Sequence, residues 1–178
     1  MQTRPAISLD GGFCILLALL VLVLPLPWLT AAILAASVHE LCHYLALRLT
    51  GASVYGLCLG LGGARMETSP LSPTQELIAA AAGPVGSALL LLLGRWMPRT
   101  ALCGVIHCIY NLLPLFPLDG GRVLRSGLTL LKAEKVFPYT QHLTRIVLVG
   151  LCVFYSVKLG AGVLLAGLLL YAVNRKRR

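Results

Sequence analysis

The chain has 178 residues, of which 58% are hydrophobic and only 12% are charged, and its mean hydropathy is +0.87. Soluble domains average about 25% charged residues, so this composition excludes an ordinary soluble protein and predicts a membrane protein with several spans. The net charge of +9 does not indicate a nucleic-acid partner, because the basic residues lie at the ends of apolar segments and in the tail at residues 175–178. Contact with the anionic headgroups of a lipid bilayer explains them better.

Two apolar segments follow a short polar start. Residues 13–28 and 30–49 predict a hairpin of membrane helices, with Thr30 as the cap of the second helix. In residues 51–69, bulky side chains alternate with glycine or cysteine at a period of two. This alternation predicts a small membrane-associated β-hairpin near residues 52–68, and a flexible glycine-rich loop is the equal alternative. Unpaired strands cannot face lipid, so a hairpin here must be buried in protein or line a wet cavity.

A helix-start signature comes next. In residues 72–75 a serine can cap the helix, a proline takes the first helical position and a glutamine takes the third, which predicts a helix as far as about Leu93. Residues 101–116 form a fourth apolar segment, and two prolines in the sequence that follows should break its helix near Asp119.

The C-terminal part contains an amphipathic stretch at residues 123–135 and apolar runs at residues 146–157 and 159–173. We interpret the two runs as two short helices, with one long, bent helix as the alternative. The predicted fold is therefore an all-α polytopic membrane protein with about six transmembrane helices and the small β-hairpin. We expect residues 1–178 to form a single membrane-embedded domain with no separate soluble domain. The six cysteines include no Cys-x-x-Cys pair and predict small buried side chains, not disulfides.

The basic residues are divided unevenly between the two sides that six spans would create. The side with more of them should be cytoplasmic, which places both termini in the cytoplasm. The second and fourth segments then both run inward, so His43 and Asp119 fall at the same depth in the cytoplasmic half of the membrane. The basic residues on the cytoplasmic side would be Arg4, Arg48, Arg65, Arg122, Arg125, Lys132, Lys135, Arg145 and the tail, against Arg95, Arg99 and Lys158 on the other side.

An H-E-x-x-H motif lies inside the second apolar segment. His39 and His43 are one helical turn apart, so both imidazoles project from one face and can bind one metal ion. Glu40 lies beside that face, where it can take a proton from a water molecule at the metal. Ionisable side chains inside a membrane are costly and usually mark function. A pair of structural histidines is the plainer alternative.

A catalytic zinc ion takes three protein ligands and leaves one position for water. Apart from Glu40, every acidic residue except Asp119 lies in a polar or terminal stretch, so elimination favours Asp119 as the third ligand, although Asp-Gly-Gly is also a turn signal. Asn111 can donate an N–H to a developing oxyanion or hold the substrate backbone, or it can bond a neighbouring helix. His107 is better suited to packing, or to contacting one of the metal-binding side chains, than to binding the metal itself.

With these residues in view, the sequence resembles the site-2 protease family of intramembrane zinc metalloproteases. The resemblance covers residues 31–122 and is nearest to the bacterial branch that processes a sporulation factor. It is carried by HELCH at residues 39–43, AAAGPVGS at residues 80–87 and NLLPLFPLDGGR at residues 111–122.

The resemblance implies a catalytic role for each candidate residue. One zinc ion per chain would be bound by His39, His43 and Asp119; Glu40 would be the catalytic acid and base, and Asn111 would help to place the substrate. The edge of the β-hairpin could accept the unfolded substrate as an added strand. The substrate would be a membrane-embedded or membrane-tethered regulatory protein of a bacterial cell membrane, such as a transcription factor, a sigma factor or an anti-sigma factor.

Two residues depart from the family pattern, which commonly has Gly at the position of Cys42 and Asn at that of Ser87. Cys42 either fills a small space or brings a thiolate to the metal, and Ser87 puts any polar role of its position in doubt. Two other functions compete with the protease. A metal-ion transporter would need a polar path to both sides, which the first, fifth and sixth segments do not offer. A proteolytically inactive scaffold would tolerate loss of Glu40, which is present.

Overall fold

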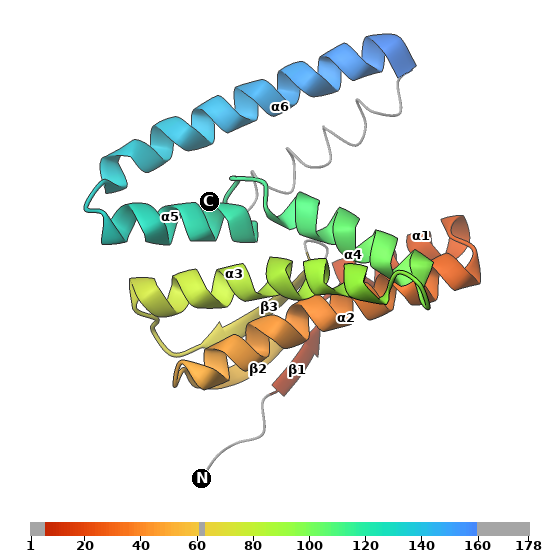
Figure 1. The fold of residues 1–178 in the computed structure, drawn as a ribbon, viewed down its shortest axis with the longest axis horizontal. Helices are drawn as coiled ribbons and strands as arrows, with labels where there is room; N and C mark the ends of the chain where they lie inside the picture. Colours follow the sequence, from red (N-terminus) through yellow and green to blue (C-terminus); the bar gives the residue numbers. More distant parts are fainter. Residues whose placement is uncertain (1–5, 61–62, 160–178) are drawn as a thin grey trace.

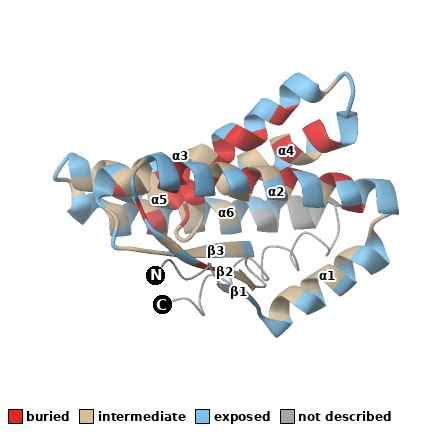
Figure 2. Ribbon diagram, turned by 90° about the horizontal axis from the view of Figure 1, so that it is seen from below, coloured by how far each residue is buried: buried red, intermediate tan, exposed pale blue. Residues whose placement is uncertain are grey.

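The computed structural model describes residues 6–60 and 63–159, and four helices form its centre (Figure 1). One of them, α3, contacts the other three, and α2 also contacts α4. The four helices are α2 (Leu26–Leu49), α3 (Pro73–Leu89), α4 (Pro98–Asn111) and α5 (Asp119–Leu130). Figure 2 shows that the buried residues gather on these helices, whereas α1 (Gly11–Val23) contains none.

Two helices in the described part of the chain are long and apolar enough to cross a membrane. They are Leu26–Leu49 and the span Pro73–Leu93, which joins α3 to the short 3-10 helix η1 (Leu90–Leu93). The number of six transmembrane helices therefore stays a prediction. The expected cap at Thr30 is wrong, because α2 begins four residues earlier and the Thr30 hydroxyl donates to the Pro27 carbonyl at 3.2 Å inside the helix.

The predicted β-hairpin is confirmed. Strands β2 (Val54–Gly60) and β3 (Gly63–Thr68) pair in antiparallel fashion. A third strand, β1 (Ala6–Leu9), pairs in parallel with β2 and gives the sheet order β1-β2-β3. From the sequence this segment was only part of a short polar start, since four residues are too few to show a period. In Figure 1 the sheet lies next to α2, and β2 contacts that helix.

The start of α3 has the predicted capping box. The Ser72 hydroxyl accepts from the Gln75 N–H at 3.3 Å, and the Gln75 side-chain oxygen accepts from the Ser72 N–H at 2.9 Å. The Gln75 amide also donates to the Thr50 carbonyl at the end of α2, at 2.8 Å. One glutamine thus fixes where α3 begins and ties that end of α3 to the end of α2.

The helix ends between α4 and α5, as the prolines predict. The loop that joins them is hydrogen-bonded to α6 (Phe137–Leu159). Gln141 of α6 is 6% exposed. Its side-chain oxygen accepts from the Phe116 N–H and its amide donates to the Pro114 carbonyl, both at 2.8 Å. The apolar run at residues 146–157 falls within α6, whereas the run at residues 159–173 lies, apart from its first residue, outside the described residues.

We expect Gln141→Met to lower the thermal unfolding temperature of the protein in detergent micelles. The substitution keeps the side-chain length but removes both hydrogen bonds to the loop, and each such bond contributes about 1 kcal/mol. Circular dichroism during heating measures the effect. His142→Met, at the neighbouring exposed position of the same helix, is the control, and an equal shift in both variants would contradict the prediction.

Candidate metal centre

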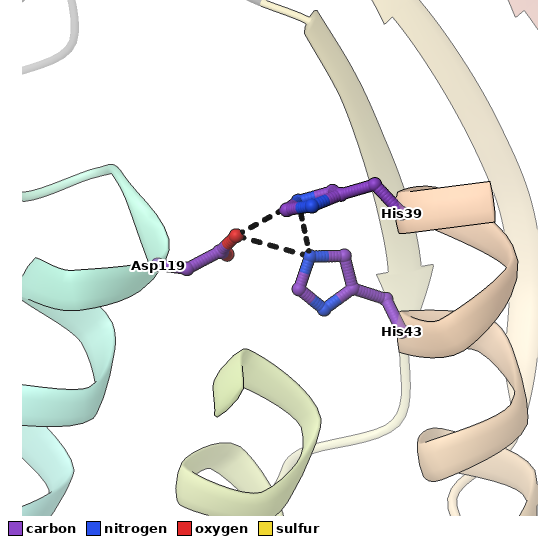
Figure 3. Close-up of side chains that lie close together, drawn as sticks. All are labelled: His39, His43 and Asp119. Atoms are coloured by element: carbon purple, nitrogen blue, oxygen red, sulfur yellow. Dashed lines mark hydrogen bonds and ion pairs between the residues drawn. The ribbon is translucent and has the colours of Figure 1, made fainter. Parts of the chain in front are cut away.

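Three side chains from two separate helices converge at the centre of the fold (Figure 3). His39 and His43 come from α2, and Asp119 is the first residue of α5, 80 positions after His39. The two Nε2 atoms lie 3.0 Å apart, and the Asp119 Oδ2 atom lies 3.0 Å from that of His39 and 3.1 Å from that of His43. All three residues are buried. In the described part of the chain this is the only group of three or more such side chains that could hold a metal ion.

The far sides of the two imidazole rings fix which nitrogen faces the centre. His43 Nδ1 lies 2.6 Å from the Ala79 carbonyl oxygen, and because a carbonyl can only accept, this nitrogen carries the hydrogen. His43 Nε2 then presents a lone pair. His39 Nδ1 lies 2.9 Å from the Ser87 hydroxyl, which can accept from that nitrogen, and His39 then has the same tautomer. Two bare nitrogens and a carboxylate oxygen facing one another repel unless a cation lies between them.

This donor set fits a zinc ion. Two imidazoles and one carboxylate form a known ligand set of catalytic zinc. With metal–ligand distances of about 2.0–2.1 Å, neighbouring ligands of a tetrahedral zinc ion lie about 3.3–3.4 Å apart. The three observed separations of 3.0–3.1 Å come within a few tenths of an ångström of that spacing. Binding would need only a small outward movement of side chains already in place.

Glycines let the backbone of neighbouring segments reach this centre. A Cβ atom at Gly83 of α3 would lie 2.2 Å from His43 Nε2 and 2.7 Å from His39 Nε2, so only glycine allows the rings to pack on this helix. At the start of α5, a Cβ at Gly120 would lie 2.2 Å from the Leu112 carbonyl oxygen. The Asp-Gly-Gly sequence therefore lets the first turn of α5 pack against the loop that precedes it.

The remaining predicted site residues lie outside the metal-binding group. Glu40 is half-buried and within electrostatic range of His43, His39 and Asp119. The Asn111 amide donates to the His107 carbonyl at 3.0 Å, one turn earlier in its own helix, and its proposed contact with substrate stays a prediction. The His107 ring packs edge-on against His39 with the ring centroids 4.5 Å apart, in agreement with a packing role.

Sequence reasoning missed two outer contacts of the cluster. It set Glu76 aside as a residue of a polar stretch, but the Arg122 Nε atom donates to Glu76 Oε1 at 2.8 Å and Arg122 Nη1 donates to Asp119 Oδ1 at 3.4 Å. It also questioned any polar role for Ser87, which is 0% exposed and bonded to His39. The only available signal was the helical spacing of these positions relative to Gly83.

Cys42 lies outside the metal-binding group. A Cβ atom at Gly86 of α3 would lie 2.2 Å from the Cys42 Sγ atom, so the thiol fills the space that this glycine leaves between α2 and α3. Of the two alternatives for Cys42, the geometry favours packing.

Comparisons with known proteins agree with this site. Residues 13–118 match the family described as Peptidase M50B-like. Over 122 residues the chain is 37% identical to a Synechocystis sp. protein named "putative zinc metalloprotease", an alignment that covers 56% of this chain and 32% of that protein. The match thus spans about a third of the relative's length. The fold is similar to that of the Site-2 Protease from Methanocaldococcus jannaschii, with a TM-score of 0.67, 20% identity, and coverage of 96% of this chain and 89% of the other.

We expect Gly83→Ala to abolish high-affinity zinc binding, because the added methyl group would occupy the space of the two ring nitrogens. Zinc content after dialysis, measured by inductively coupled plasma mass spectrometry, tests this. Gly127→Ala is the matched control, since nothing lies within 4 Å of a Cβ atom there, and alanine favours a helix interior by about 1 kcal/mol. Equal zinc contents in the two variants would contradict the placement of Gly83.

Proposed function

This chain belongs to the Peptidase M50B-like family of site-2 proteases, and we propose that it is an intramembrane zinc metalloprotease. In this proposal it hydrolyses peptide bonds of membrane-embedded or membrane-tethered regulatory proteins. The observation that carries the proposal is the convergence of His39, His43 and Asp119, with the Nε2 atoms of both rings directed at the same point as the Asp119 carboxylate.

The setting of the cluster supports cleavage within the bilayer. Helix α2, which carries both histidines, is one of the two described helices long and apolar enough to span a membrane. It continues for several turns on the N-terminal side of His39, through residues that include Ile33 and Leu34, which are 48% and 41% exposed. Such a helix surface suits contact with lipid, and His39 lies well inside the helix.

The proposed chemistry assigns each residue one task. His39, His43 and Asp119 would hold the zinc ion, which when bound supplies a Lewis acid that polarises the scissile carbonyl and acidifies water. Glu40 would take a proton from the attacking water molecule as the water oxygen bonds to the carbonyl carbon. It would then deliver that proton to the leaving nitrogen as the C–N bond breaks. The Asn111 amide would exchange its hydrogen bond to the His107 carbonyl for one to the substrate carbonyl or backbone.

The substrate and its approach are also part of the proposal. We expect a bacterial membrane protein with a regulatory role, such as a membrane-tethered transcription factor, sigma factor or anti-sigma factor, and a multi-pass topology with both termini in the cytoplasm. Among the described residues β1 and β3 are the two edge strands of the sheet, and either edge could receive an extended substrate segment as an added strand. Backbone hydrogen bonds would then hold the scissile region unfolded.

We expect Glu40→Gln to retain zinc and to lose cleavage by about 10²–10⁴-fold, the usual contribution of a positioned acid-base group. Cleavage of a single-span reporter panel reconstituted in liposomes, with fragments identified by mass spectrometry, measures activity. Glu134→Gln, at an exposed position after α5, is the control for loss of a carboxylate. Wild-type cleavage by Glu40→Gln would rule out this mechanism, and the same variant can trap uncleaved substrates for identification.

We expect Asp119→Ala to weaken zinc binding by more than the roughly 10–100-fold typical of losing an outer-sphere partner, because it removes a direct ligand. Competition with a chromogenic chelator gives the zinc dissociation constant of the detergent-purified protein. Asp10→Ala, at an exposed position before α1, is the control. A zinc affinity unchanged by Asp119→Ala would leave the site with two histidines and exclude the proposed ligand set.

A further inference from the structure

One face of α3 contacts both histidines of the metal-binding cluster directly and reaches Asp119 through Arg122. The contacts come from positions 76, 79, 83 and 87, which are spaced by three or four residues and therefore lie on a single helical face. The Ala79 carbonyl holds His43, and Gly83 is the surface on which both imidazole rings rest. The two remaining positions, Glu76 and Ser87, carry the polar side chains of this face.

Ser87 acts on His39 directly. Its side chain is 0% exposed, and its hydroxyl lies 2.9 Å from His39 Nδ1, on the side of the ring opposite to the metal-binding nitrogen. A partner at this position fixes the rotation of the ring, and when the hydroxyl accepts from Nδ1–H it leaves Nε2 unprotonated. The ring edge also packs on His107, but that contact cannot select a tautomer.

Glu76 acts on Asp119 through an arginine. Glu76 lies in the first turn of α3, and Arg122 lies one turn after Asp119 on α5. The guanidinium donates to Glu76 at 2.8 Å through Nε and to Asp119 Oδ1 at 3.4 Å through Nη1. The second oxygen, Oδ2, faces the two histidines. Glu76 thus anchors the group that occupies one carboxylate oxygen and leaves the other for the metal.

We propose that Ser87 and Glu76 are positioning residues of the metal centre, Ser87 by orienting His39 and Glu76 by holding Arg122 against Asp119. In this arrangement α3 supplies an outer contact to each of the three ligands without contributing a ligand itself. The inference rests on the proposed function, because it assumes that the cluster binds zinc. It adds that the polar face of α3 sets the affinity and geometry of that binding.

The test measures zinc affinity by chelator competition on the full chain in detergent, together with the visible absorption bands of the cobalt-substituted protein, which report ligand geometry. Ser87→Ala is compared with Ser126→Ala, a serine that is 4% exposed on α5. Glu76→Gln is compared with Glu67→Gln. Arg122→Gln and the double variant Glu76→Gln/Arg122→Gln complete a cycle.

We expect Ser87→Ala and Glu76→Gln each to weaken zinc binding about 10–100-fold and to shift the cobalt bands, while the controls do neither. Because Glu76 acts through Arg122, adding Glu76→Gln to Arg122→Gln should change the affinity by less than about twofold. Circular dichroism of the metal-free proteins separates these effects from loss of fold. If Ser87→Ala does not fold, the zinc affinity of the Glu76→Gln variant decides the proposal, because Glu76 is half-exposed and its substitution disturbs packing less.

The outcomes separate this inference from the proposed function. A wild-type chain that binds no zinc would overturn the metalloprotease itself. A wild-type chain that binds zinc, with variants at Glu76 and Ser87 that match their controls in affinity and cobalt spectrum, would overturn only the role of α3. Full additivity of Glu76→Gln and Arg122→Gln would overturn the indirect route through Arg122.

Discussion

Mutual repulsion among three electron-rich atoms is the constraint that the centre of this fold must satisfy. His39 Nε2, His43 Nε2 and Asp119 Oδ2 lie within 3.1 Å of one another, in surroundings with little access to water. Such atoms stay together only when a cation joins them and when their far sides are held in place. The Ala79 carbonyl, the Ser87 hydroxyl and the Arg122 guanidinium provide that hold, and all three depend on the position of α3.

Local patterns in the sequence were sufficient to predict the parts of the site that lie close together in the chain. The spacing of His39 and His43 is a property of one helix, and the capping box at Ser72 involves residues three positions apart. Asp119 was reached by elimination, which succeeded because so few carboxylates occur in this apolar chain. The alternation in residues 51–69 likewise predicted the two strands of the hairpin, with a flexible loop as the equal alternative.

The parts that could not be predicted depend on contacts between distant segments. Strand β1 has only four residues and is defined by its pairing with β2, not by a period of its own. Glu76 looked like an ordinary polar residue of a helix start, since its partner Arg122 is 46 positions away. Gln141 was not singled out from the sequence, because the loop backbone that its side chain bonds lies 25 and 27 positions earlier in the chain. A single sequence carries no local signal of these pairings.

The two hydrogen bonds from Gln141 to the loop between α4 and α5 have a consequence for biosynthesis. The ribosome makes α2 and α3 before α5 and α6, and the contacts of the two imidazoles with Ala79 and Ser87 involve only α2 and α3. The carboxylate arrives later, and the loop before it gains its hydrogen bonds only when α6 has been translated and joined to the bundle. A nascent chain would thus carry a two-histidine half-site through most of its insertion and would gain the complete ligand set at a late stage.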